Sequence, residues 1–386
     1  MADAVSPQAQ RLHDASLIVD LHAHPSFKTF LWRKRLADRH RPGGSLSPFS
    51  MRVDLPKMRD GGLNVLLSAI HLPERALLKD CGPIRLAKMF APRRLKDLFD
   101  RNPFEQTMKM IDDFESQARL SYFSRDNVTT QLEFAMSGAD VDDIMSRHHI
   151  AALHTIEGAH SLDGEIQNVR KFFDRGVALI TLAHFYENGV AAPVHGVPPG
   201  MRKLGCFDEP VDLSKGLTPF GRDAVEEMLD LGILVDMTHC TKTARDEVVS
   251  IATAKGRPPV MTHVGVKALA DREMNPDDAE IRTIADAGGL IGVIFMNYWI
   301  TEHHHTKPGL AFVVETMKHL KQTGGVECIG VGSDFDGFTD PPDDLKDPSQ
   351  LPHLTEALSR AGFTDDEIEQ IWGLNFRRVL ASGWGR

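Results

Sequence analysis

The stretch LIVDLHAHPSF, residues 17–27, is an apolar run that ends in two histidines one residue apart, His22 and His24. Continuous Val, Ile and Leu without polar alternation is typical of a parallel strand that is covered on both faces. Side chains at positions i and i+2 of a strand leave the same face of the backbone, so both imidazoles can point at one site. Two histidines at a strand end can also be hydrogen-bonded loop residues, so the pair alone leaves both interpretations open.

The same pattern recurs along the chain, where short apolar runs alternate with longer helical patterns. The runs are residues 16–24, 63–70, 150–158, 177–184, 233–239, 259–264, 290–296 and 328–335. In one helical pattern, Thr218 and Pro219 stand where an N-cap and a first helical residue are expected. Eight strands that alternate with crossover helices predict an α/β protein, a (β/α)8 TIM barrel. An open doubly wound sheet is the alternative, but no glycine-rich phosphate loop follows the first strand.

We expect one domain over residues 1–386, with two insertions into the barrel. Residues about 25–53 are basic and broken by Gly, Pro and Ser, and residues about 72–148 are mostly helical and longer than a crossover needs. Each insertion follows a strand and therefore leaves the barrel at its C-terminal face, where barrel enzymes carry their active sites. Either can form the rim of a site, but we interpret the second as helical filler.

Composition and charge exclude several classes of protein. A hydrophobic content of 42% with 25% charged residues predicts a globular chain with a large core. The formal net charge of -10 argues against nucleic acid and anionic membranes as partners. The first residues do not form a signal sequence and no apolar run approaches a membrane span, so we expect a cytoplasmic protein. The cysteines lack CxxC spacing, and we expect reduced thiols at Cys81, Cys206, Cys240 and Cys328.

Polar side chains gather at the carboxyl ends of the predicted strands. They are His22, His24, Glu157, His184, His239, His263, Asp334 and Asp336. Buried imidazoles and carboxylates cost free energy unless they have partners, and one shared metal centre would explain their common placement. Imidazole nitrogen and carboxylate oxygen are donors that zinc-like ions take. The sequence therefore predicts a metal centre at this face of the barrel.

These donors are too many for one tetrahedral ion, so we expect two ions. His22 and His24 would hold the first ion, and His239 and His263 the second. Glu157 has two carboxylate oxygens and can bridge the pair. A water molecule shared between the ions would lose a proton near neutral pH and act as the nucleophile.

Several motifs resemble those of a known enzyme family. They are DLPKMRDGG before the second strand, then IEGAHSLDG, TLAHFYENG, GLTPFGRDAVEEMLDLGILVDMTH, VMTHVGVKAL, GVGSDFDG and the terminal GLNFRRVL. In order and spacing they resemble the renal (membrane) dipeptidase family of zinc peptidases, metallopeptidase family M19, within the amidohydrolase superfamily. The resemblance runs from the first strand to the C-terminus.

The resemblance implies a binuclear zinc dipeptidase that acts on dipeptides or dipeptide-like small molecules. It gives the same ligands as above, with Glu157 as the bridge. His184 matches a histidine that contacts the substrate and polarises the scissile carbonyl or holds the oxyanion. Asp334, at the metal centre, would orient the bridging hydroxide and pass its proton to the leaving amine. Asp336 falls outside the ligand set. Family members often dimerise, so a homodimer is also among the expectations that the resemblance implies.

Two positions depart from the family pattern. His24 stands where the better-known dipeptidases have aspartate, which removes one negative charge from the site. Met274 stands where an arginine usually pairs with the free carboxylate of the dipeptide. Arg272 lies close by in the sequence and is our candidate for that role, and Tyr298 is a candidate wall of the substrate pocket.

These departures keep other functions open. An amidohydrolase acting on another small amide, lactam or ester is the alternative, and a catalytically inactive metal-binding protein is a further one. A catalytically competent residue at every ligand position and at Asp334 argues against the inactive metal-binding protein. The tract HHH at 303–305 is in a predicted loop after the seventh strand, and composition alone assigns it no function.

Overall fold

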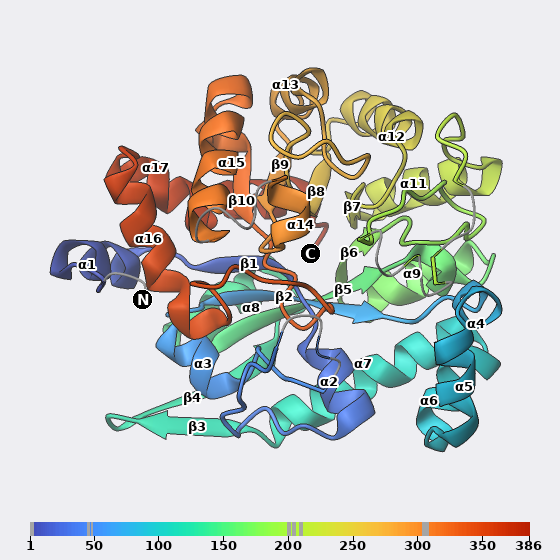
Figure 1. The fold of residues 1–386 in the computed structure, drawn as a ribbon, viewed down its shortest axis with the longest axis horizontal. Coiled ribbons are helices and arrows are strands. Elements are labelled where there is room, and N and C mark those ends of the chain that lie inside the picture. The colour runs from blue at the N-terminus through green and yellow to red at the C-terminus, as the bar shows by residue number, and fades with distance from the viewer. Residues whose placement is uncertain are drawn as a thin grey trace.

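Eight parallel strands form a nearly closed barrel in the computed structural model, which describes residues 4–44, 47, 49–198, 202, 206–207, 211–302 and 309–386 (Figure 1). In order around the barrel they are β1 (Val19–Ala23), β2 (Val65–His71), β5 (Ile150–Glu157), β6 (Val177–Thr181), β7 (Leu234–Asp236), β8 (Val260–Val264), β9 (Leu290–Val293) and β10 (Ile329–Val331). Between β10 and β1, the amide of His24 donates to the carbonyl of Phe335 at 2.9 Å. The predicted (β/α)8 barrel and its eight strands are confirmed.

Helices surround the barrel, as Figure 1 shows. Those that follow the later strands are α9 (Gln167–Asp174), α11 (Pro219–Leu231), α12 (Lys242–Ala254), α13 (Asp278–Asp286), α14 (Asn297–Ile300) and α15 (Gly309–Gly324). The chain ends in α16 (Leu351–Arg360), α17 (Asp365–Glu369) and α18 (Asn375–Gly383). Before β2 lie α1 (Pro7–Ala15), α2 (Pro25–Trp32) and α3 (Leu55–Asp60). Within the described ranges, no helix has the length and apolar character needed to cross a bilayer.

Alternate strand residues pack on opposite sides of the barrel wall. One buried set contains Val19, Leu21, Val65, Leu67, Leu153, Leu179, Leu234, Val260 and Leu290, together with Phe376 and Trp384. The other set contains their neighbours Ile18, Leu66, Ala152, Ile180, Val235, Met261 and Ile291. Room for Leu21 depends on glycine, because a Cβ at Gly292 or Gly330 would lie 3.0 or 2.8 Å from its Cδ1. Both faces of each strand are therefore apolar, as the continuous apolar runs predict.

The long insertion between β2 and β5 contains more than helices. Its helices are α4 (Ala76–Asp80), α5 (Gly82–Phe90), α6 (Arg93–Asp100), α7 (Pro103–Arg119) and α8 (Gly138–Ser146). An antiparallel hairpin of β3 (Tyr122–Arg125) and β4 (Val128–Phe134) was not predicted, and β4 also pairs with the start of β5. Its turn residues Asp126 and Asn127 have φ values of 52° and 62°, which these two residue types tolerate best after glycine. The dipeptide Asp126–Asn127 was therefore the signal in the sequence that could have predicted the hairpin.

The prediction of four reduced thiols is wrong for two of them. Cys81, between α4 and α5, forms a disulfide with Cys206, 125 residues further along the chain. The bond joins the long insertion to the segment after β6, and both sulfurs are buried beside Leu77 and Tyr186. Cys240 and Cys328 are free and buried. The pairing depends on two distant segments meeting in space, which cysteine spacing does not reveal. The tract at 303–305 lies outside the described residues.

The N-cap of α11 provides a test of local stability. Thr218 accepts a hydrogen bond from the amide of Gly221 at 2.9 Å and donates one to the carbonyl of Gly189 at 2.7 Å, so the predicted cap is confirmed. Thr218→Ala should lower the free energy of unfolding by about 1 kcal/mol, because one helical amide loses its acceptor. Urea denaturation measures the change, and Thr218→Ser is the matched control that should retain wild-type stability. Equal losses in both variants would contradict the capping role.

Candidate metal centre

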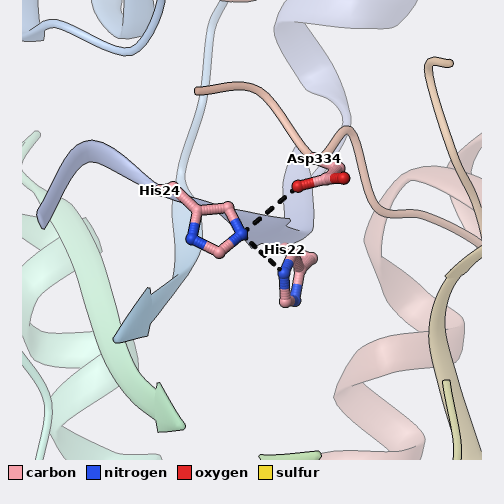
Figure 2. Close-up of side chains that lie close together, drawn as sticks. All are labelled: His22, His24 and Asp334. Atoms are coloured by element: carbon pink, nitrogen blue, oxygen red, sulfur yellow. Dashed lines mark hydrogen bonds and ion pairs between the residues drawn. The ribbon is translucent and has the colours of Figure 1, made fainter. Parts of the chain in front are cut away.

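The predicted ligands converge at the carboxyl ends of the strands. Figure 2 shows His22 and His24 at the end of β1 with Asp334, which follows β10. The Nε2 atoms of the two histidines are 3.0 Å apart, and His24 Nε2 lies 3.2 Å from Asp334 Oδ1. Residues more than 300 positions apart in sequence are thus brought together because β10 and β1 are neighbours in the barrel.

Glu157, the last residue of β5, lies at the middle of this group. Its Oε1 atom faces three imidazole nitrogens: His239 Nε2 at 3.2 Å, His22 Nε2 at 3.3 Å and His263 Nε2 at 3.6 Å. His239 and His263 are 3.1 Å apart through their Nε2 atoms. One oxygen of the carboxylate is therefore surrounded by nitrogens that come from three different strand ends.

The other carboxylate oxygen, Glu157 Oε2, faces a second set of imidazoles. His71 Nδ1 lies 3.2 Å from it, His24 Nε2 3.6 Å and His184 Nε2 3.9 Å. His71 ends β2 and pairs in register with Glu157 on β5. The two oxygens thus divide the imidazoles into two groups, and this division places His22 with His239 and His263 instead of with its expected partner His24.

The spacing of these donors fits divalent metal ions. Two donors bound to one tetrahedral zinc ion at about 2.0–2.1 Å lie roughly 3.3 Å apart. Two groups of donors can be compared with this distance: His22, Glu157 and His263, and His22, His24 and Asp334. Four separations between donor atoms in these groups lie between 3.0 and 3.6 Å, namely His22–His24, His24–Asp334, His22–Glu157 and His263–Glu157. A third group consists of His71, Glu157 and His184. All donors are imidazole nitrogen or carboxylate oxygen, which suit zinc-like ions.

Metal binding needs neutral imidazoles and ionised carboxylates, and four of the predicted ligands are shifted in that direction. Burial lowers the pKa of His24 to about 3, and the nearby His22 and His184 add to this effect. Burial likewise lowers the pKa values of His239 and His263. Although burial opposes ionisation of Glu157, the imidazoles around it hold the pKa of that carboxyl well below its usual range. Burial opposes protonation of His22, but the carboxylates of Glu157 and Asp334 outweigh it and raise the pKa of His22 to about 9. Without metal, His22 is therefore protonated next to the anionic bridge, and an ion bound there would displace that proton.

The backbone is adjusted locally to aim these side chains. Strand register shifts between Asp20 and Ala23 in the β1–β2 pair and between Met261 and Val264 in the β8–β9 pair, each next to a histidine of the site. His239 and Asp334 have φ values of 70° and 54°, in the left-handed region that few non-glycine residues adopt. Irregularities of this kind at a barrel rim redirect side chains toward a common point.

Buried polar residues below the site orient its histidines. The Thr262 hydroxyl lies 2.8 Å from His263 Nδ1 and donates to Asp236 Oδ2 at 2.7 Å. Asp20 accepts from the Ser333 hydroxyl at 2.5 Å and from the His22 amide at 3.2 Å. Fixing the outer nitrogen of an imidazole leaves its inner nitrogen directed at the shared site. Asp336, by contrast, accepts from the amides of Arg52 and Val53 and lies outside the donor groups found among the described residues.

Two residues of the site, His71 and Glu74, were missed by the sequence reasoning. The predicted second strand ended at Ile70, so His71 fell one position outside the strand-end rule that found the other ligands. Glu74 Oε1 lies 2.9 Å from His184 Nδ1 and accepts from the Phe185 amide at 3.0 Å. Glu74 belongs to the insertion that we interpreted as helical filler, and that interpretation is wrong for its first residues.

The predicted substrate residues Arg272 and Tyr298 lie together, with the guanidinium 4.2 Å from the ring centroid. Both terminal nitrogens of Arg272 pair with Glu302, at 2.7 and 2.8 Å. Met274 is fully buried. Two aromatic residues lie against the histidines: Trp299 stacks on His263 with ring centroids 6.0 Å apart, and the Phe185 ring centroid is 4.0 Å from that of His184. The substrate roles of Arg272 and Tyr298 therefore stay predictions.

Comparisons with known proteins show the family to which the chain is related. A family model described as membrane dipeptidase (peptidase family M19) matches residues 6–382. An uncharacterised dipeptidase of Schizosaccharomyces pombe is 34% identical over 238 residues, which cover 60% of this chain and 53% of the relative. Dipeptidase tcpJ of Claviceps purpurea is 29% identical over 256 residues, covering 65% and 55%. The matched regions therefore span about half the length of these two relatives.

Solved structures share the fold at low sequence identity. The dipeptidase PvdM of Pseudomonas aeruginosa, described as probable, has a TM-score of 0.75 at 20% identity and covers 97% of both chains. A metallopeptidase from Rhodobacter sphaeroides, solved with a phosphinate mimic of the dipeptide L-Ala-D-Ala, has a TM-score of 0.74 at 19% identity and covers 96% of this chain and all of the other. At these identities the likeness shows the fold.

Metal removal should change the stability of the protein. Ions that bind only the native state stabilise it by about 2.7 kcal/mol each at a free concentration 100-fold above Kd. We therefore expect the thermal midpoint of the chelator-treated protein to rise when zinc is added, as measured by calorimetry. Glu157→Gln should abolish most of this response, because Glu157 contacts both donor groups. Glu165→Gln, on an exposed carboxylate, is the control that should respond like wild type. A wild-type midpoint indifferent to zinc would contradict the metal centre.

Proposed function

The chain belongs to the membrane dipeptidase family, peptidase family M19, and from that premise we propose that it is a metal-dependent hydrolase of dipeptides or dipeptide-like small molecules. The observation that carries the proposal is the pair of imidazole groups on the two oxygens of buried Glu157. A relative of the same fold binds a phosphinate mimic of a dipeptide, which supports an amide bond of that size as the target. The net charge of -10 argues against a polyanionic substrate.

We propose zinc as the metal, with two ions per chain. His22 and His24 would hold the first ion, His239 and His263 the second, with Glu157 between them and Asp334 beside His24. Bound in this way, such ions supply a hydroxide nucleophile near neutral pH and polarise the substrate carbonyl.

His184 is placed to bind the substrate carbonyl. Glu74 holds its Nδ1 atom, so Nε2 faces the site, 3.9 Å from Glu157 Oε2. Burial opposes protonation of this imidazole, but the carboxylates of Glu74 and Glu157 outweigh burial and raise the pKa of His184. A protonated imidazole with a fixed ring is a hydrogen-bond donor to the oxyanion that develops during amide hydrolysis.

Asp334 is placed to move the proton. Its carboxyl is almost buried and lies beside His24, opposite Glu157. Burial, with the charge of Glu157, raises the pKa of Asp334 to about 7, although the nearby histidines oppose the shift. A carboxyl group poised near neutral pH can accept a proton from the attacking water and donate it to the leaving amine. The left-handed backbone at Asp334 keeps the group at the site.

The role of Asp334 can be tested with an isosteric variant. Asp334→Asn should lower kcat for dipeptide hydrolysis by about 10²–10⁴-fold, because an amide cannot carry the proton. The rate is measured on metal-reconstituted protein whose metal content is determined in parallel. Asp126→Asn, in the exposed β3–β4 turn, is the control that should keep the wild-type rate. Undiminished turnover in Asp334→Asn would contradict the proposed proton transfer.

A second candidate function follows from the surroundings of Arg272. Because Glu302 occupies both terminal nitrogens of this guanidinium and Met274 is buried, the expected cation for a free dipeptide carboxylate is already paired. This observation favours substrates without that carboxylate, such as another small amide, a lactam or an ester.

A substrate panel separates the two candidates. A dipeptidase that reads the free carboxylate should lose about tenfold or more in kcat/KM when the dipeptide is replaced by its C-terminal amide, since a hydrogen bond to a charged group is worth about 1.5–3 kcal/mol. The second candidate predicts equal or better turnover of the amide. Turnover of lactones or N-acyl amino acids with no turnover of any dipeptide would overturn the dipeptidase proposal.

A further inference from the structure

His71 lies in the metal centre although the predicted ligand set does not contain it. It ends β2 and is the register partner of Glu157 on β5. Its Nδ1 atom is 3.2 Å from Glu157 Oε2, closer than either His24 or His184, and equally 3.2 Å from the Glu157 carbonyl oxygen. The side chain is 13% exposed, so its position is fixed by the barrel rim. The imidazole that lies nearest to the second carboxylate oxygen thus comes from a strand that supplied no expected ligand.

Glu74 faces the outer side of this imidazole, beyond hydrogen-bond reach. Its Oε2 atom lies 4.0 Å from His71 Nε2, while its Oε1 atom binds His184 Nδ1 at 2.9 Å. Both rings therefore have one nitrogen toward Glu74 and the other toward Glu157. A carboxylate on the outer nitrogen with the inner nitrogen directed at a shared point is the usual arrangement of histidines that bind metals.

We propose that His71 is a ligand, through Nδ1, of the metal ion on the Oε2 side of Glu157, and that Glu74 holds its imidazole in place. The inference rests on the proposed function in so far as it requires divalent ions at this centre. It adds His71 to the carboxylate oxygen Oε2, within a group of possible metal ligands that also contains His184.

A matched pair of variants tests the proposal. Aspartate and asparagine have the same size, and their terminal atoms lie as many bonds from Cα as His71 Nδ1, but aspartate is much the better zinc ligand. We expect His71→Asn to weaken binding of one of the two ions by about 100-fold or more, which is a larger loss than a residue that only positions a ligand would cause. The metal affinity of His71→Asp should stay within about tenfold of wild type. Glu74→Gln should weaken binding of that ion by about 10–100-fold.

The readout is metal binding to the full-length protein. Zinc content is measured after dialysis against chelator-buffered zinc, and the visible absorption of the cobalt(II)-substituted protein reports the coordination of each ion. His160→Gln is the control: this half-buried imidazole lies beside His71, with ring centroids 6.3 Å apart, but bonds the carbonyl of Leu72 at 2.7 Å. It should retain both ions and the wild-type cobalt spectrum.

The outcomes distinguish this inference from the proposed function. If His71→Asn keeps two ions at wild-type affinity with an unchanged cobalt spectrum, His71 is not a ligand. If the wild-type protein binds two ions and His71→Asn binds only one, the ligand assignment holds. If that wild-type protein nevertheless hydrolyses no small amide, the proposed function fails while the ligand assignment stands. A wild-type protein that binds no divalent ion overturns both.

Discussion

The site depends on one buried carboxylate, that of Glu157, which stays ionised inside the barrel. Burial alone would favour its protonation, and an unpaired buried charge costs several kcal/mol. Six imidazoles within 4 Å of its two oxygens reverse this preference. Cations bound between the nitrogens and the carboxylate would neutralise the charge more completely, because each would accept lone pairs from both. The need to compensate this charge explains why so many strand ends carry polar residues.

The barrel meets that need through local departures from regular strands. Parallel strands place their carboxyl ends in a ring, but a ring of regular strands would direct alternate side chains into the apolar wall. Register shifts beside His22 and His263, and left-handed backbone at His239 and Asp334, turn these side chains toward Glu157. The apolar packing of the wall, with residues such as Leu21 seated against glycines, holds the irregular rim on a rigid base.

The sequence predicted those parts of the structure that depend on local patterns. Apolar runs located all eight strands, and the polar residues at the ends of six of these runs located most donors. His71 was missed because the expected end of its strand was one residue early, and Glu74 because it lies in an insertion with no periodic signal. The Cys81–Cys206 bond and the register shifts arise from contacts between distant segments. Such contacts have no signature in the spacing of residues along one chain.

The chemistry and the substrate recognition of this protein have separate structural origins. The donors around Glu157 come from strand ends, whose positions the barrel fixes. Trp299, which stacks on His263, comes from the short helix after β9, and the Arg272–Glu302 pair joins the loops after β8 and α14. The disulfide joins the insertion after β2, which contains Glu74, to the segment after β6, which contains His184. It therefore helps to keep these two residues in contact. Changes in these loops can therefore alter which amide is bound while the metal ligands stay in place.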